Sequence, residues 1–274
     1  MNEQRPVPAG VDPLVPSPAR IYDYLLGGSY NFAADREVAE RGLARVPELR
    51  DVILANRGFH GRAAHWLATR GIDQFLDIGS GLPTVGNTHE VVRAVRPAAR
   101  VVYADIDPMV AACAADLLTE PATTRVVLGD LRDPDALLDS PDVRELIDLS
   151  QPVGLLMTAV LHFVADASDP WALVRRYLDA LAPGSYLAMS HATYDNLPEQ
   201  AVQVGRDEYQ RATEQFYYRS RAEIERFFTG LELVPPHPGV PPSLAYMGEW
   251  GAESVALADS DGSRWGYCGV GRKP

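Results

Sequence analysis

The chain has 274 residues, 46% of them hydrophobic, which is enough to bury one large core. It carries 25 Lys and Arg against 37 Asp and Glu, a formal net charge of −12. Such an acidic surface repels phosphate backbones and anionic lipid headgroups, so we expect no nucleic-acid partner and no membrane partner. The two cysteines lack metal-ligand spacing, and neither a signal sequence nor a membrane-spanning apolar run is evident, so we expect a soluble, cytoplasmic protein.

The first part of the chain predicts a proline-rich leader followed by helices. Five prolines among the first 18 residues indicate a leader without a core of its own. Apolar residues at helical spacing then predict three helices, whose ends are marked by Gly27, Pro47 and Gly71. We therefore divide the chain into a leader with a helical appendage, residues 1–70, and a second domain, residues 71–274.

From residue 72 onward, short apolar runs alternate with helical stretches, which is typical of a parallel sheet covered on both faces. The expected strands are Gln74–Ile78, Val101–Ala104, Arg125–Leu128, Pro152–Thr158 and Tyr186–Ser190, with helices near 86–96, 108–119, 133–149 and 169–182. A capping box at Ser220 then opens a helix that runs to Gly230. Two last runs, Leu231–Val234 and Trp265–Val270, predict an antiparallel closing pair. The expected fold is α/β, with a doubly wound sheet.

Acidic residues follow the first three strands and flank a glycine-rich turn. Asp77 precedes Gly79-Ser80-Gly81, Asp105 ends the second strand, and Asp130 follows the third. Ligands of open parallel sheets bind beyond the carboxyl ends of the strands, and glycines there let the backbone approach a ligand closely. Asp105 is placed to bind a ribose diol, and Asp130 to accept from the exocyclic amine of adenine. The alternative for each carboxylate is a helix N-cap, which fits Asp107 well.

A turn that binds a dinucleotide is the main rival interpretation. Its fingerprint needs a third glycine, where this chain has Thr84 preceded by Pro83. A pocket lined by acids also suits a cofactor with a sulfonium and an ammonium group and disfavours a pyrophosphate. The residues therefore favour S-adenosylmethionine. A nicotinamide-dependent oxidoreductase and a non-catalytic module that binds S-adenosylmethionine stay open as alternatives.

These motifs carry a resemblance to a known family. The order hydrophobic-Asp-x-Gly-x-Gly, Asp-x-Asp-Pro, Gly-Asp resembles class I S-adenosylmethionine-dependent methyltransferases over about residues 72–190. More narrowly, the whole chain resembles a family of S-adenosyl methyltransferases with mostly unassigned substrates, through ARIYDYLLGG at 19–28, QFLDIGSGLPT at 74–84, VLHF at 160–163 and GVGRKP at 269–274. The resemblance implies a Rossmann-like, seven-stranded sheet with its last strand pair antiparallel. It also implies S-adenosylmethionine bound across Gly79, Gly81, Asp105 and Asp130.

Two histidines that follow strands are candidates for a general base. His162 comes after the fourth strand and His191 after the fifth, and a base is needed only if the acceptor atom carries a proton. The alternative for each is a structural histidine. The stretch after the fourth strand lacks the carboxylates of a catechol-type Mg²⁺ site, so we expect no metal. The aromatic residues Tyr209, Phe216, Tyr217 and Tyr218 either cover an apolar acceptor or belong to a helix core.

A short polar and aromatic helix before Gly27 predicts a lid over the cofactor. Arg20 is expected to meet the carboxylate of the cofactor and Tyr22 to pack nearby, with a plain packing helix as the alternative. The residues expected to bind the cofactor are Arg20, Tyr22, Asp77, Gly79, Ser80, Gly81, Asp105, Ile106, Asp130, Leu131, Thr158 and Ala159. The sequence thus predicts a metal-independent methyltransferase acting on a small-molecule acceptor.

Overall fold

The computed structural model describes residues 7–83, 86–117, 120, 122–209 and 212–274. Its helices are α1 (Pro18–Leu25), α2 (Ala33–Arg45), α3 (Leu49–Thr69), α4 (Thr88–Arg93), α5 (Pro108–Leu117), α6 (Pro134–Leu138), α7 (Pro141–Leu146), α8 (Pro170–Ala180), α9 (Glu199–Tyr209), α10 (Arg221–Glu225) and α11 (Val255–Ala258), and the 3-10 turns are η1 (Leu161–Phe163), η2 (Asp166–Ser168), η3 (Arg226–Phe228) and η4 (Gly262–Trp265). Its strands are β1 (Gln74–Ile78), β2 (Arg100–Asp105), β3 (Thr124–Leu128), β4 (Gly154–Thr158), β5 (Tyr186–Ala192), β6 (Glu232–Leu233), β7 (Ala245–Tyr246) and β8 (Gly266–Arg272).

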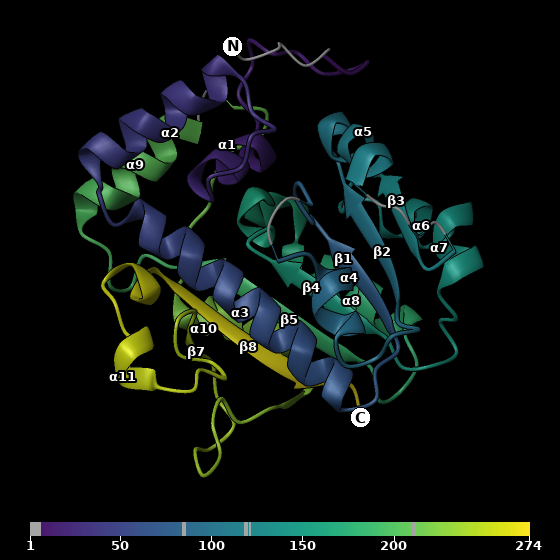
Figure 1. Cartoon of the computed structure of the whole chain (residues 1–274). Helices are drawn as coiled ribbons and strands as arrows, with labels where there is room; N and C mark the ends of the chain where they lie inside the picture. Colours follow the sequence, from purple (N-terminus) through teal and green to yellow (C-terminus); the bar gives the residue numbers. More distant parts are fainter. Residues whose placement is uncertain (1–6, 84–85, 118–119, 121, 210–211) are drawn as a thin grey trace.

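The strands form one sheet in the order β3-β2-β1-β4-β5-β8-β6, and β7 also pairs with β8 (Figure 1). Strands β1 to β5 are parallel, whereas β8 runs antiparallel to β5, β6 and β7. The chain moves outward from β1 to β3 and then returns to β4 on the other side of β1. In such sheets, ligands bind beyond the carboxyl ends of the strands at this reversal. The predicted Rossmann-like α/β fold with antiparallel last strands is confirmed.

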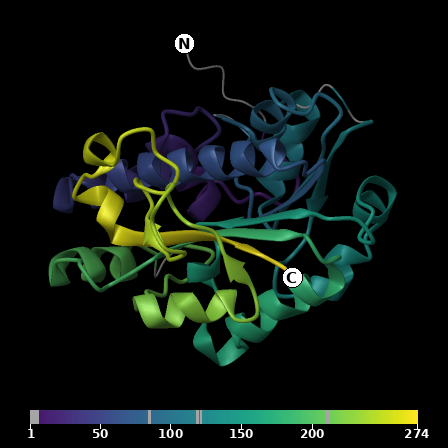
Figure 2. The same ribbon diagram turned by 90° about the horizontal axis from the view of Figure 1, so that it is seen from below.

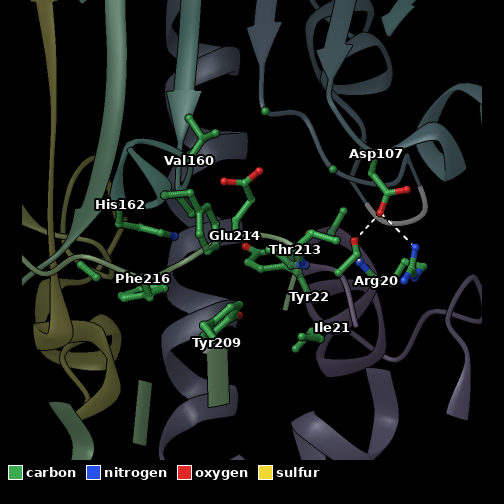
Figure 3. A pocket seen from close by; sticks show the side chains of 18 of the residues that line it. Arg20, Ile21, Tyr22, Asp107, Val160, His162, Tyr209, Thr213, Glu214 and Phe216 are labelled. Atoms are coloured by element: carbon green, nitrogen blue, oxygen red, sulfur yellow. Dashed lines mark hydrogen bonds and ion pairs between the residues drawn. The ribbon is translucent and has the colours of Figure 1, made fainter. Parts of the chain in front are cut away.

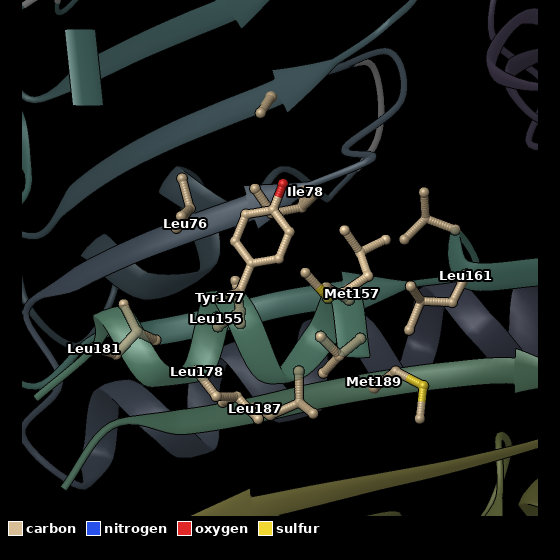
Figure 4. Packing of buried hydrophobic residues seen from close by; sticks show 14 of the residues in the cluster. Leu76, Ile78, Leu155, Met157, Leu161, Tyr177, Leu178, Leu181, Leu187 and Met189 are labelled. Atoms are coloured by element: carbon tan, nitrogen blue, oxygen red, sulfur yellow. The ribbon is translucent and has the colours of Figure 1, made fainter. Parts of the chain in front are cut away.

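Helices cover both faces of the sheet (Figure 2). On one face, Leu155 and Met157 of β4 belong to a buried cluster with Tyr177 of α8 (Figure 4). On the other face, Phe59 of α3 shares a second cluster with Phe75 of β1. Burying each such side chain stabilises the fold by about 1.5–3 kcal/mol relative to leaving it exposed. Burial on both faces explains why the central strands are apolar throughout rather than alternating.

Helices α1, α2 and α9 gather beyond the carboxyl ends of the strands, and we call these three helices the roof (Figure 1). Helix α1 packs on α2, and α2 packs on α9. At the outer edge of the roof, Arg41 of α2 pairs with Glu208 of α9 at 3.0 Å, and Arg45 pairs with Asp207 at 3.3 Å. The 21-residue helix α3 runs from the roof across one face of the sheet.

Two helices differ from the sequence prediction. The single helix expected over 133–149 is two helices, α6 and α7. A new helix begins there because the Ser140 side chain accepts from the backbone N–H of Val143 and Pro141 occupies the first helical position. The helix opened by the later capping box is α-helical only as far as Glu225 and continues as the 3-10 turn η3.

The sequence does not predict β7 or α9. Strand β7 is only two residues long, within a proline-bearing loop, and therefore too short for a recognisable alternation. Two parts of the sequence prediction lie outside the described residues. They are Thr84, at the position of the third glycine in a dinucleotide turn, and the last two residues of the helix expected over 108–119. Across the described ranges, we find no helix with the length and apolar character that a membrane span requires.

Candidate active site

A cavity of about 510 Å³ begins at the carboxyl ends of β1, β2 and β4 and continues beneath the roof. Every residue that the sequence predicts for cofactor binding or catalysis lines this cavity, with the exception of Asp77. Figure 3 shows Arg20 and Asp107 on one side of the cavity and His162, Phe216 and Tyr209 on the other. The structure therefore brings together residues from both halves of the chain, and the two sides differ in chemistry.

The two glycines of the first turn have different tasks. Both adopt the left-handed backbone region, with φ of 67° at Gly79 and 64° at Gly81. A Cβ on Gly79 would lie 2.1 Å from the side chain of Val160, so the turn after β4 packs directly against its backbone. A Cβ on Gly81 would meet nothing within 4 Å. Gly79 therefore allows close packing, and Gly81 leaves space at the cavity.

The turn after β2 is organised by two carboxylates. Asp105 accepts from the backbone N–H groups of Gly81 at 2.8 Å and Asp107 at 3.0 Å, and its burial raises its pKa to about 6. Between them, the side chain of Ile106 is 46% exposed, an apolar surface next to the cavity. Asp107 accepts from the N–H of Met109 at 2.9 Å, which is the helix-capping bond weighed as its alternative role.

Asp130 does not act alone at its strand end. Both of its carboxylate oxygens accept from Nε of Arg132 at 2.9 Å, and Arg132 also pairs with Glu214 at 3.2 Å. Arg20 and Arg57 line the same cavity. The expectation of an acidic pocket is therefore wrong in this respect, because arginines from three separate segments contribute to its walls.

Arg20 binds carboxylates of its own chain. Its Nε lies 3.0 Å from Asp35, which is fully buried, and its Nη1 lies 3.4 Å from Asp107. The hydroxyl of Ser17 also donates to Asp107. These contacts attach α1 to the turn after β2, directly beside the expected cofactor site, and they occupy the guanidinium with partners that the sequence analysis did not assign to it.

Tyr22 joins the roof to α3. Its hydroxyl donates to the carbonyl of Ile53 at 3.3 Å and accepts from Nδ2 of Asn56 at 2.8 Å, and burial raises its pKa. Asn56 accepts in turn from the hydroxyl of Ser190 at 2.5 Å. Ser190 also accepts from the N–H of Ala159, a residue with φ of 54°, so these bonds hold a strained turn after β4 in place.

Asp77 faces away from the cavity and ends a buried chain of hydrogen bonds. The hydroxyl of Thr88 donates to Asp77 at 2.6 Å and lies 2.8 Å from Nε2 of His60, whose Nδ1 lies 2.9 Å from the hydroxyl of Thr158. Because the single hydroxyl proton of Thr88 goes to Asp77, Nε2 of His60 carries a proton and its Nδ1 accepts from Thr158. Burial raises the pKa of Asp77 to about 6 and lowers that of His60 well below 6.5.

His60 is not among the residues that we predict from the sequence, although one signal points to it. His60 follows Phe59 on the buried face of α3, where a histidine needs polar partners on the neighbouring elements. The chain of bonds ends at Thr158, which lines the cavity, so His60 orients a residue of the site from outside it.

His191 is hydrogen-bonded through both ring nitrogens. Its Nε2 accepts from Nη1 of Arg219 at 2.6 Å, which leaves the proton on Nδ1 to be donated to the carbonyl of Ala192 at 2.7 Å. Arg219 is buried and also pairs with Asp166 at 2.7 Å. Burial and the Arg219 charge lower the pKa of His191 to about 3. These contacts favour a structural role for His191 over that of a general base. His162 remains the candidate for the general base.

His162 has a different environment. Its ring stacks on Phe216 at 4.3 Å between centroids and packs edge-on against Phe163 at 4.5 Å. Burial, then His191 and Arg219, lower its pKa well below 6.5, which keeps the imidazole neutral at neutral pH. Within the described ranges, Nδ1 of His162 has no hydrogen-bond partner although the side chain is buried. The ring of His162 therefore lines the cavity, whereas its Nδ1 is enclosed by protein atoms without a hydrogen bond among the described residues.

Comparisons with known proteins identify the family of the chain. A sequence model of the S-adenosyl methyltransferase family matches residues 4–274. A candidate methyltransferase from Thermobifida fusca is 41% identical, with 97% of this chain and 98% of that chain covered and a TM-score of 0.88. A DUF574 family protein from Streptomyces avermitilis is 40% identical, with 95% and 98% covered and a TM-score of 0.88. The search of curated proteins found no match.

A more distant structure shares the fold alone. The plantazolicin methyltransferase BpumL, solved with S-adenosylhomocysteine and a triazolic desmethyl analogue, is 11% identical over 93% of this chain and 96% of that one, with a TM-score of 0.51. Together, the fold, the glycine turn and these comparisons define an S-adenosylmethionine-dependent methyltransferase. The chain belongs to the S-adenosyl methyltransferase family, and its cofactor is S-adenosylmethionine. This decides against the nicotinamide-dependent oxidoreductase and the non-catalytic module.

Proposed function

We propose that this methyltransferase acts without a metal on a small-molecule acceptor that binds beneath the roof. One observation carries the proposal: a single cavity joins the glycine turn to the imidazole of His162. A cavity of about 510 Å³ falls within the range of roughly 300–1,000 Å³ typical of sites for small molecules. Enclosure by the roof suits a compact acceptor better than a nucleic acid or a membrane surface, and we propose a cytoplasmic location for the same reaction.

The turns at the strand ends fit the cofactor. The open space beside Gly81 permits a ligand to approach the backbone closely. The exposed side chain of Ile106 offers an apolar surface to the adenine ring of the cofactor. In this assignment, Asp105 binds the ribose hydroxyls, and Asp130 with Leu131 meets the adenine. When bound, the cofactor supplies a methyl group on a positively charged sulfur.

The proposal gives positioning the larger part of the catalysis. A sulfonium methyl group is already activated, so the protein must orient the acceptor in line with it and exclude water. Thr158 ends β4 and Ala159 begins the turn after it, between the two ends of the cavity, and His60 and Ser190 hold these two residues. His162 takes a proton where the acceptor loses one.

The proposal assigns no metal because the carboxylates of the site already have partners. Asp105 binds backbone N–H groups, Asp107 binds Ser17 and Arg20, and Asp130 binds Arg132. The same contacts support the proposal of a lid, since they attach α1 to the turn beside the cofactor. We retain the division of the chain at residue 70 as part of this proposal.

Transfer of labelled methyl groups tests the proposed function. The protein is incubated with S-adenosylmethionine labelled in its methyl group and a cell extract separated into small molecules, protein and nucleic acid, with and without EDTA. We expect label in the small-molecule fraction and no effect of EDTA. Label confined to the protein or nucleic-acid fraction would contradict the proposal of a small-molecule acceptor. Loss of label in the presence of EDTA would contradict the proposal that the reaction needs no metal.

A further inference from the structure

The part of the cavity beneath the roof is apolar. Its walls include Val38 of α2, Ile53 of α3 and Val204 of α9. Val38 and Val204 belong to two separate hydrophobic clusters, and members of both clusters line the cavity. This part of the cavity therefore lies between the two clusters. The carboxylates on these walls, Glu208 and Glu214, are ion-paired with arginines. A ligand here meets hydrocarbon rather than an uncompensated charge.

Aromatic rings form the boundary between this apolar part and the strand ends. Tyr209 lies 5.5 Å from Phe163 and 5.2 Å from Phe216 between ring centroids, and Phe216 lies 4.8 Å from Tyr218. Tyr209, Phe216 and Tyr218 line the cavity. Ring faces and edges at these distances provide favourable contacts for another planar ring.

His162 is the polar group at this boundary. Its imidazole points into the cavity (Figure 3), and its side chain is 6% exposed. A neutral imidazole can accept a hydrogen bond from a ligand through the nitrogen that faces the cavity. The stack with Phe216 fixes the ring plane and therefore the direction of that bond.

We propose that the acceptor is an apolar aromatic molecule with one phenol-type hydroxyl, whose ring lies against Tyr209, Phe216 and Tyr218 and whose hydroxyl donates to the imidazole nitrogen of His162 that faces the cavity. The proposal rests on the proposed function and narrows its substrate to one chemical class. A charged acceptor is disfavoured because nothing in the apolar walls would compensate its desolvation.

The transfer balances with His162 as the base. The phenolic oxygen forms a bond to the methyl carbon while the bond from that carbon to sulfur breaks, and the electron pair of the broken bond stays on the sulfur. The phenolic proton moves to the cavity-facing nitrogen of His162 and then to solvent. The products are an aryl methyl ether, S-adenosylhomocysteine and a proton.

Binding of a matched pair of probes tests the hydroxyl. We compare 2-naphthol with 2-fluoronaphthalene on protein saturated with S-adenosylhomocysteine, by fluorescence titration. We expect the hydroxyl to improve the affinity about tenfold in the wild type, the effect of about one buried hydrogen bond, and to improve it little in His162→Phe. Equal affinities of the two probes for the wild type would overturn the role of His162 without reference to any variant.

Filling the hollow tests where the acceptor lies. Val204→Phe places a ring in the apolar part and should weaken 2-naphthol at least tenfold, whereas Val255→Phe adds the same ring on the exposed helix α11 and should not. Ala39→Leu, a smaller change on α2, serves if the first variant unfolds. Unchanged affinity in a folded, filled variant would place the acceptor elsewhere.

Two further measurements separate this proposal from the proposed function. Wild-type protein with S-adenosylmethionine should form 2-methoxynaphthalene and should bind 4-hydroxybenzoate more weakly than 2-naphthol, because the latter probe carries no carboxylate. Tighter binding of 4-hydroxybenzoate overturns the apolar class but leaves a small-molecule methyltransferase intact. Methylation confined to protein or nucleic acid overturns the proposed function itself.

Discussion

The two ends of the cavity are built in different ways. At the strand ends, every carboxylate has hydrogen bonds within the protein: Asp105 with Gly81, Asp107 with Arg20, and Asp130 with Arg132. Beneath the roof, the walls are apolar and one buried nitrogen, on His162, has no partner among the described residues. The polar end is organised before a ligand arrives, and the apolar end takes part of its organisation from the ligand.

This difference indicates that the two ends of the cavity can change independently. The strand ends need only a short turn and a few acids to fix their hydrogen bonds in advance. The apolar end is shaped by the roof, whose residues can change size without disturbing the hydrogen bonds around Asp105. A variant that alters one end of the cavity therefore shows whether the other end responds.

The largest effect is expected at the attachment of the roof to the cofactor end. Arg20→Gln removes the cation beside the buried carboxylates of Asp35 and Asp107, and such a loss typically costs about 3–5 kcal/mol in the free energy of unfolding. Urea denaturation measures it. Arg96→Gln breaks an exposed pair with Asp73, and its cost in the free energy of unfolding should be far smaller. If Arg20→Gln lowers the free energy of unfolding as little as Arg96→Gln, the attachment of α1 through Arg20 is weak.

The two glycines of the first turn should separate folding from binding. Gly79→Ala combines a positive φ with a clash against Val160, and we expect a loss of about 3 kcal/mol in unfolding free energy. Gly81→Ala has the positive φ alone and should lose about 1–2 kcal/mol. Calorimetry with S-adenosylhomocysteine should show weaker binding for Gly81→Ala because its methyl group enters the cavity. Similar stabilities for the two variants would contradict the assignment.

Asp105→Asn tests the cofactor end directly. The amide cannot accept two hydrogen bonds from a ribose diol as the carboxylate does, so we expect the Kd for S-adenosylhomocysteine to rise about 100-fold, or roughly 2.7 kcal/mol. The exposed Asp139→Asn serves as the control, with an unchanged Kd. An unchanged Kd for Asp105→Asn would remove this residue from the site.

The last prediction concerns pH. The pKa of His191 is about 3 in the folded protein and about 6.5 when unfolded, so the unfolded state binds the proton first as the pH falls. His191 therefore lowers the free energy of unfolding by about 1.4 kcal/mol per pH unit below about pH 6.5. We expect His191→Gln to remove this contribution between pH 6 and 4, whereas the exposed His65→Gln should not. If the free energy of unfolding falls equally with pH in the wild type and in His191→Gln, the buried environment of His191 would be contradicted.

The sequence predicts which residues meet at the strand ends because the determinants of that edge are local. Each strand and the residue that follows it are neighbours in the chain, so the order of strand, glycine turn and acid places Gly79, Asp105 and Asp130 at one edge once the sheet is parallel. The apolar strands and the helical spacing between them likewise predict the sheet and the antiparallel closing strand.

The rest depends on contacts between segments far apart in the chain. Arg20 and Asp107 are 87 residues apart, and His60 and Thr158 are 98 residues apart, so no local pattern announces either pair. The opposite surroundings of His162 and His191 also come from distant residues, Phe216 for one and Arg219 for the other. Sequence reasoning therefore found both histidines as candidates but had no means to distinguish them.

The ion pairs between α2 and α9 make one side of the roof sensitive to ionic strength. Arg41 is 50% exposed, and Arg45 and Asp207 are each 38% exposed, so dissolved ions reach these charges and screen them over a Debye length of about 8 Å at physiological salt. The buried Arg20 attachment is shielded from those ions. Added salt should therefore weaken the outer edge of the roof before it affects the Arg20 attachment.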